Sequence, residues 1–96
     1  MTFTLLFYSS GNSNYIMDFI RSTEKPTQAK ILRSLDLVGK YGLNVGMPHI
    51  KKMTKNLFEL RVRGKQEVRL FFSTEGDKIL FLHGFIKRQI KLQGTK

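Results

Sequence analysis

The sequence contains no cysteine, and no apolar run approaches the ~20 residues that a membrane-spanning helix needs. Without cysteine, the chain has no thiol nucleophile, no disulfide framework and no cysteine-ligated metal site. The N-terminal segment MTFTLLFYSS is apolar, but it has no basic start and is too short for the apolar region of a signal peptide. These absences favour a cytoplasmic protein whose first segment is a strand.

Acidic residues are scarce, because the chain has 17 Lys and Arg but only 7 Asp and Glu, a net charge of +10. Residues 1–48 carry five basic and three acidic side chains (5 − 3 = +2), and residues 49–96 carry twelve and four (12 − 4 = +8). Such a basic half favours a polyanionic partner such as RNA or DNA, bound largely through counterion release. The alternatives are an acidic protein partner and a soluble domain that is simply basic.

The 96 residues are expected to form one domain, residues 1–96, of the α+β class. Ser13 or Asn14 is a suitable N-cap for a first helix, and Gly42 stands where a glycine commonly ends a second one. The expected elements are a strand at Thr2–Tyr8, helices at Tyr15–Ser22 and Thr27–Tyr41, and strands at Leu57–Arg63, Glu67–Ser73 and Lys78–Phe85. The last three strands should form an antiparallel meander with both helices on one face, and residues 42–56 should form a loop.

The alternation of apolar residues in LFELRVRGKQEVRLFF, residues 57–72, predicts which side chains share a face of the sheet. A shift of one residue would turn a strand inside out, so we expect the numbers of paired residues to sum to 130. Leu60 then lies opposite Leu70 in the core, and Arg61 lies opposite Arg69 on the other face.

The same reasoning, with a sum of 152, predicts that Arg69 lies opposite His83 in the next hairpin. It places Leu80 and Leu82 in the core. The alternate residues of that strand are expected on the arginine face: Ile79, Phe81, His83 and Phe85.

A row of Arg61, Arg69 and His83 is unfavourable for the sheet alone, because like charges opposite each other repel. An anion bound to this face would explain the row, with Glu59 holding the arginines when the site is empty. Phe71 and Phe81 can offer stacking surfaces for unpaired bases. The alternatives are a solvated face with Glu–Arg pairs, a second small core around the phenylalanines, and a histidine that only packs.

Three segments, IKKMTKNLFELRV, EVRLFF and ILFLHGFIKR, resemble the RelE/HigB superfamily of bacterial toxins, nearest to its phage-derived host-inhibition branch. The resemblance covers essentially the whole chain. It implies a RelE-like fold, a curved antiparallel sheet under two N-terminal helices. It also implies the toxin of a type II toxin–antitoxin system, an mRNA endonuclease that acts on the ribosome. The implied partner is a small antitoxin, with a helix-turn-helix and an acidic contact surface.

The sequence departs from the family pattern at two places. Asn56 replaces the usual glycine before LFELR, which asks for a different turn. After Arg88 the family usually adds a further helix, whereas here QIKLQGTK follows. We therefore expect the end of the site to differ from that of the family.

The candidate chemistry needs no metal or other cofactor, because two histidines and scattered carboxylates offer no ligand cluster. RNA carries its own nucleophile, the 2′-OH, so an enzyme need only align it, stabilise charge and move protons. Arginine suits the charge step because its planar fork matches phosphate oxygens. The candidate catalytic residues are Arg61, Arg69, His83, Lys87 and Glu59.

In this scheme Arg61 and Arg69 grip the scissile phosphate, Glu59 orients them, and His83 or Lys87 moves protons. A lysine with a pKa lowered by neighbouring cations is an alternative base. The candidate RNA-binding residues are Lys51, Lys52, Lys55, Arg63, Phe71, Phe81, Arg88 and Lys91. Three other functions stay open: a ParE-like inhibitor of DNA gyrase, a noncatalytic RNA- or ribosome-binding module, and a toxin that has lost its activity.

Overall fold

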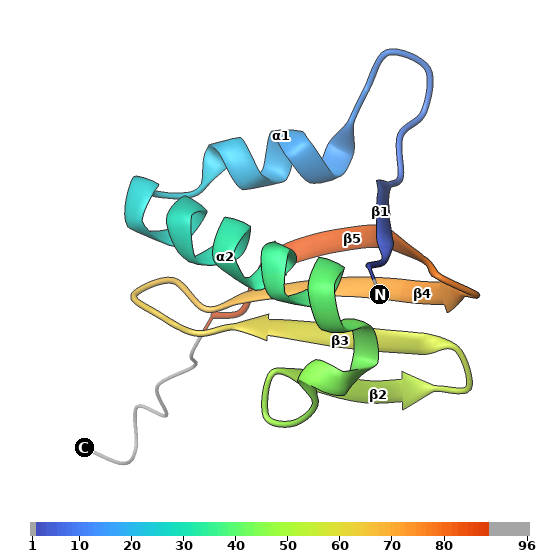
Figure 1. Cartoon of the computed structure of the whole chain (residues 1–96). Coiled ribbons are helices and arrows are strands. Elements are labelled where there is room, and N and C mark those ends of the chain that lie inside the picture. The colour runs from blue at the N-terminus through green and yellow to red at the C-terminus, as the bar shows by residue number, and fades with distance from the viewer. Residues whose placement is uncertain (1, 89–96) are drawn as a thin grey trace.

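The computed structural model describes residues 2–88, which form two α-helices packed on one face of a five-stranded sheet (Figure 1). The elements in chain order are β1 (Thr4–Phe7), α1 (Tyr15–Ser22), α2 (Lys25–Tyr41), a short 3₁₀ helix η1 (Gly42–Val45), β2 (Ile50–Thr54), β3 (Leu57–Val62), β4 (Val68–Glu75) and β5 (Lys78–Ile86). The strand order is β1-β5-β4-β3-β2. The α+β prediction is confirmed, although the sheet is mixed because β1 runs parallel to β5.

Both helices begin and end close to where the sequence predicts. The Asn14 side chain accepts a hydrogen bond from the Met17 N–H at 3.1 Å, so Asn14 is the N-cap of α1. The second helix begins at Lys25, two residues before the predicted start, because Pro26 is accommodated in its first turn. Gly42 ends α2 with a φ of 58°, a conformation that favours glycine. Within residues 2–88, neither helix has the length and apolar character to cross a membrane.

Strand β2 corrects the prediction of a continuous loop over residues 42–56. Only Ile50 of its five residues is buried, because β2 is an edge strand that pairs with β3 alone. A segment with so few apolar residues has no period-2 signal. Its strand conformation comes from the ladder with β3, in which Ile50 lies opposite Leu60 and Lys51 opposite Glu59.

The core lies between the helices and the sheet, and the β3–β4 register is the predicted one. Leu60 pairs with Leu70 and Arg61 pairs with Arg69. The buried apolar residues are Ile16, Ile20, Ile31, Leu35, Val38, Ile50, Leu60, Val62, Val68, Leu70, Phe72, Ile79 and Phe81. The α1 helix approaches β5 closely, since a Cβ on Gly84 would lie 2.6 Å from Leu70 and 2.8 Å from Phe19.

The β4–β5 register differs from the prediction because β5 contains a β-bulge. Phe71 lies opposite His83, whereas Phe72 lies opposite Phe81, so Leu82 is one residue in excess. Because of this extra residue, even-numbered positions of β5 such as Gly84 face the helices after the bulge, whereas odd-numbered positions such as Phe81 face them before it. The reversal could not be read from the alternation of apolar residues, because ILFL is apolar on both faces.

Three predictions for β5 are therefore wrong. Ile79 and Phe81 are buried in the core under the helices, and Leu80 and Leu82 are half-buried rather than core residues. Phe81 packs against Phe72, with ring centroids 5.2 Å apart, so it is not a stacking surface for bases. Arg69 lies opposite Phe85, and not opposite His83.

Candidate functional site

The face of the sheet that the helices leave open carries most of the candidate residues. We call it the open sheet face and define it by Lys51 from β2, Glu59 and Arg61 from β3, Arg69 and Phe71 from β4, and His83 and Phe85 from β5. Two rows run across the strands. The first is Lys51–Glu59–Phe71–His83, and the second is Arg61–Arg69–Phe85.

Arg61 and Arg69 are direct cross-strand partners. The Arg61 N–H donates to the His49 carbonyl at 2.7 Å, so the backbone polar groups of Arg61 face the β2 side of β3. Arg61 and Arg69 therefore form a pair without mutual backbone hydrogen bonds, in which the Cα atoms are about 4.5 Å apart. The register thus brings two guanidinium groups close together on the open sheet face.

Glu59 joins the two arginines. Its Oε1 accepts hydrogen bonds from Arg61 Nε at 3.0 Å and from Arg69 Nη1 at 3.2 Å. Arg69 also donates from Nη2 to Glu67 Oε1 at 3.4 Å. The centre of this network is buried, since Glu59 is 5% and Arg69 8% exposed. The predicted contact of Glu59 with both arginines is confirmed, and it is made where solvent screens charges weakly.

The pKa of Glu59 is below its ordinary value. Burial alone would raise this pKa, but the hydrogen bond from Arg61 and the charge and hydrogen bond of Arg69 outweigh burial. The carboxylate is therefore ionised at neutral pH, in agreement with the sequence-based expectation. An ionised acceptor keeps both guanidinium groups oriented on the open sheet face.

The two arginines differ in how far they reach solvent. The Arg61 side chain is 19% exposed and that of Arg69 is 9% exposed. Arg69 has carboxylates on two sides, whereas Arg61 has Glu59 alone among residues 2–88. Arg61 is thus the more accessible member of the pair, and it has fewer carboxylate contacts to exchange for a ligand.

Aromatic rings stand beside the arginines. The Phe71 ring lies 6.4 Å from the His83 ring and 5.6 Å from that of Phe85, and the His83 and Phe85 centroids are 5.9 Å apart. His83 is exposed, and both phenylalanines are half-buried. We call Phe71, His83 and Phe85 the aromatic triad. Phe85 was predicted on this face but is not among the candidate site residues; its alternation with His83 is the sequence signal that could have identified it.

The predicted lysines do not all share this face. Lys51 lies opposite Glu59, but the next residue, Lys52, lies opposite Phe58 on the helix side of the sheet. Lys55 lies in the turn between β2 and β3. The expectation that these lysines converge on one side is therefore wrong for Lys52, since successive side chains of a strand alternate between faces.

A third row of charges flanks the arginine pair. Arg63 Nη1 lies 3.8 Å from Glu67 Oε2. The backbone N–H of Lys87 donates to the backbone carbonyl of Glu67 at 2.7 Å, which places Lys87 opposite Glu67. Lys87 and Arg88 are both exposed. Lys91, another predicted RNA-binding residue, lies outside the described residues. The positive charge of the open sheet face thus continues beyond Arg61 and Arg69 towards the end of β5.

Asn56, the residue that departs from the family pattern, ties the β2–β3 turn to β4. Its Nδ2 donates to the Thr74 carbonyl at 3.0 Å, and its Oδ1 accepts from the Thr74 N–H at 3.3 Å and the Thr74 hydroxyl at 3.1 Å. Asparagine therefore supplies a contact that the usual glycine cannot make.

Among residues 2–88, no group of three or more His, Asp or Glu side chains gathers in an arrangement that could hold a metal ion. In a comparison with protein families, residues 18–96 match the family described as "Phage derived protein Gp49-like (DUF891)". No curated protein matches the chain. The family match includes β2 to β5, which carry every residue of the open sheet face.

Proposed function

Since the chain belongs to the phage-derived Gp49-like family, we propose that it is the toxin of a type II toxin–antitoxin system and cleaves mRNA on the ribosome. The observation that carries the proposal is the Arg61–Arg69 pair around a buried carboxylate, next to the aromatic triad. A cytoplasmic location follows from the proposed action on ribosomes.

The proposed reaction is attack of the RNA 2′-oxygen on the neighbouring phosphorus. The bond from phosphorus to the 2′-oxygen forms as the bond to the 5′-oxygen of the next nucleotide breaks, which leaves a cyclic phosphate. The 2′-OH proton goes to a base, and the departing 5′-oxygen receives a proton. Such a reaction needs alignment and charge stabilisation, which arginine provides.

We assign the phosphate contact to Arg61, because its side chain is the more exposed of the pair. Arg69 is a positioning residue: Glu67 holds the Arg69 guanidinium, and Arg69 holds Glu59. When a phosphate enters, Arg61 can exchange its bond with Glu59 for a phosphate oxygen, while Arg69 continues to neutralise the carboxylate. This assignment refines the initial idea that both arginines grip the phosphate.

His83 and Lys51 are the proposed proton carriers, since both lie in the row next to the arginine pair. His83 is exposed, and an imidazole ring can both donate and accept a proton. Lys87 is the alternative donor at the far side of the arginines. The aromatic triad would stack on bases, and Lys55, Arg63 and Arg88 would follow the phosphates of the bound strand.

A noncatalytic RNA- or ribosome-binding module is the second candidate. It is favoured by the fact that both arginines already have carboxylate partners, as a structural network would. Such a module would bind RNA with a strong dependence on salt but leave it intact. The two candidates therefore differ in whether a bond in RNA is broken.

The test is to incubate the purified protein with ribosomes that are translating a defined message and to map the 5′ ends of fragments. The nuclease proposal expects cleavage that depends on ribosomes and persists with EDTA-treated protein. Arg61→Ala should abolish cleavage, whereas Arg21→Ala, on the exposed side of α1, should not. Binding to ribosomes without any cleavage would overturn the nuclease in favour of the module. Inhibition of DNA supercoiling in a parallel assay would instead indicate a gyrase inhibitor.

A further inference from the structure

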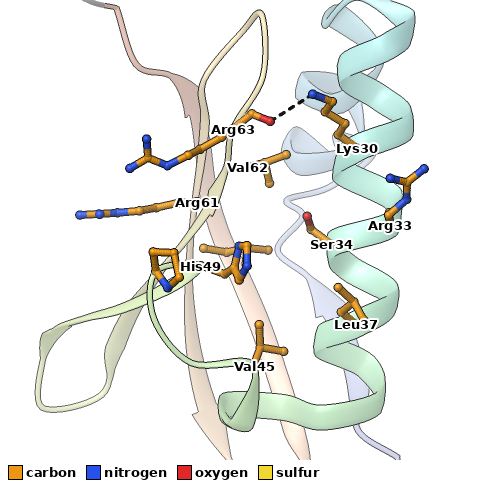
Figure 2. Close-up of a pocket in the computed structure, with 11 residues that line it drawn as sticks. Lys30, Arg33, Ser34, Leu37, Val45, His49, Arg61, Val62 and Arg63 are labelled. Carbon is orange, nitrogen blue, oxygen red and sulfur yellow. Dashed lines mark hydrogen bonds between the residues drawn. The ribbon is translucent and has the colours of Figure 1, made fainter.

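A groove separates α2 from the edge of β3 (Figure 2). Its floor residues Leu60 and Val62 alternate along β3 with Glu59 and Arg61 of the open sheet face, so the groove is on the opposite face from the aromatic triad. It encloses about 300 Å³. One helix face, formed by Lys30, Ser34 and Leu37 together with Arg33, makes one wall. Leu60 and Val62 of β3 form the floor, and the segment around Val45 to His49 closes one end.

The groove has an apolar interior and a basic border. The described lining residues include four Lys or Arg and no Asp or Glu: two are on α2, Arg61 is on β3, and Arg63 directly follows β3. Within residues 2–88, neither Lys30 nor Arg33 has a carboxylate within 4.0 Å. In Figure 2 the side chains of Arg61 and Arg63 point away from α2. Lys30 is the lining cation that extends from α2 towards β3, and Arg33 lies at the outer border of the groove.

The edge of β3 is open along this groove. β2 pairs with β3 only as far as Leu60, where Ile50 is its partner. Beyond this point Arg61 donates to the His49 carbonyl, but His49 directs its own N–H to the Gly46 carbonyl, at 3.1 Å. Among the side-chain contacts of the described residues, the Arg63 carbonyl accepts one hydrogen bond, from the exposed Lys30 Nζ at 3.5 Å. Such an edge can accept another strand.

We propose that this groove docks an acidic, extended segment of a partner protein. The segment would pair with the Arg61 carbonyl and with the Arg63 backbone directly after β3, and would insert alternate apolar side chains between α2 and β3. Its carboxylates would meet Lys30 and Arg33. Main-chain pairing supplies affinity in this mode of recognition, and the pocket for alternate side chains supplies specificity.

The chemistry of the groove favours this occupant over two others. An RNA strand would place phosphates and sugars against Val45, Leu60 and Val62, which offer no polar partner through their side chains. Residues 89–96 of the chain, QIKLQGTK, carry two lysines and no acidic residue, so Lys30 and Arg33 would repel them. The proposal does not depend on the nuclease, because the groove and the aromatic triad lie on different sides of β3.

The test uses the whole chain, labelled with ¹⁵N, and a short peptide of alternating glutamate and valine. We expect amide shifts at Ser34, Val45 and Val62, and an affinity that falls as salt increases. A peptide of alternating lysine and valine should not bind. Shifts confined to Phe71 and His83, or no shifts, would overturn the proposal. An oligo(U) strand added in a second titration should shift the aromatic triad, which separates failure of the groove from failure of the nuclease proposal.

Two pairs of variants complete the test. Ser34→Trp should fill the groove and weaken binding of the acidic peptide at least about tenfold, whereas Leu32→Trp, at an exposed position of α2, should not. If Ser34→Trp fails to fold, the charge-reversal variant Arg33→Glu takes its place in the test. Arg33→Glu should weaken binding to a similar extent, and Arg21→Glu on α1 should leave it unchanged. Equal affinity of Arg33→Glu and the unaltered chain would overturn the assignment.

Discussion

Arg61 and Arg69 lie directly opposite each other on β3 and β4, and both donate to the same carboxylate oxygen of Glu59. Two adjacent positive charges in a sheet repel, and an ionised carboxylate between them removes most of that cost. The arrangement leaves one arginine buried and one partly exposed. A stable fold and a reactive cation are thus supplied by the same three residues.

The first prediction concerns the stability that Glu59 provides. Glu59→Ala should lower the free energy of unfolding by about 3–5 kcal/mol, because it leaves Arg69 buried without its carboxylate partner. Glu59→Gln should cost less, since the amide oxygen can still accept. Urea denaturation followed by circular dichroism measures both. Glu75→Ala, at the exposed end of β4, is the control and should change little. Equal midpoints for Glu59→Ala and this control would contradict the buried network.

The second prediction is the pH dependence that follows from the lowered pKa of Glu59. In the unfolded chain the carboxyl has its ordinary pKa of about 4.5, so the unfolded state binds a proton first as the pH falls. The stability from Glu59 is therefore complete above about pH 4.5 and is lost as the pH falls through the folded-state pKa. The difference in unfolding free energy between the unaltered chain and Glu59→Gln should shrink in acid. A difference that stays constant between about pH 7 and pH 3 would disprove this linkage.

The third prediction separates the two arginines. Arg61→Ala should reduce the cleavage rate by about 10²–10³, equivalent to about 2.7–4 kcal/mol of transition-state stabilisation, with a small effect on stability. Arg69→Ala should reduce both cleavage and stability, because Arg69 is the more buried arginine and contacts both Glu59 and Glu67. Single-turnover cleavage and urea titrations on the same preparations provide the two readouts. If Arg69→Ala is as stable as Arg61→Ala, the distinction between contact and positioning is incorrect.

The fourth prediction tests the bulge in β5. Phe81→Ala should destabilise the fold by about 3–5 kcal/mol, because Phe81 is fully buried between Phe7 and Phe72. Phe71→Ala, on the open sheet face, should cost clearly less, since its ring is only half-buried. Thermal unfolding of the two variants compares the positions directly. The reverse order of stability would restore the register in which Phe81 faces outward.

The sequence predicted the β3–β4 register because its apolar residues alternate on one face only. Leu60 and Leu70 must be buried together, which leaves Arg61 opposite Arg69. The sequence ILFLHGF allowed no such inference, since both faces of β5 are apolar around Leu82. The excess residue at the bulge is therefore visible only in the pairing of Phe71 with His83 and of Phe72 with Phe81.

Other elements were hidden because tertiary contacts, and not local pattern, create them. Strand β2 exists through its ladder with β3, and the groove exists because that ladder ends at Leu60. By contrast, Asn14 and Gly42 act through their own side chain or backbone, so the helix ends were predictable.

The last prediction concerns the aromatic triad. Phe85→Leu should weaken binding of single-stranded RNA by about 1–3 kcal/mol if the Phe85 ring stacks on a base, because leucine retains much of the buried volume but has no π face. Phe58→Leu is the matched control, since Phe58 lies on the helix side of the sheet. Fluorescence anisotropy with labelled oligo(U) at fixed salt measures the affinity, and thermal unfolding confirms that both variants fold. An equal loss of affinity in the two variants would mean that Phe85 supports the sheet without touching RNA. His83→Ala should in that case leave binding unchanged as well, because the His83 and Phe85 rings are neighbours, 5.9 Å apart, and would contact the same base.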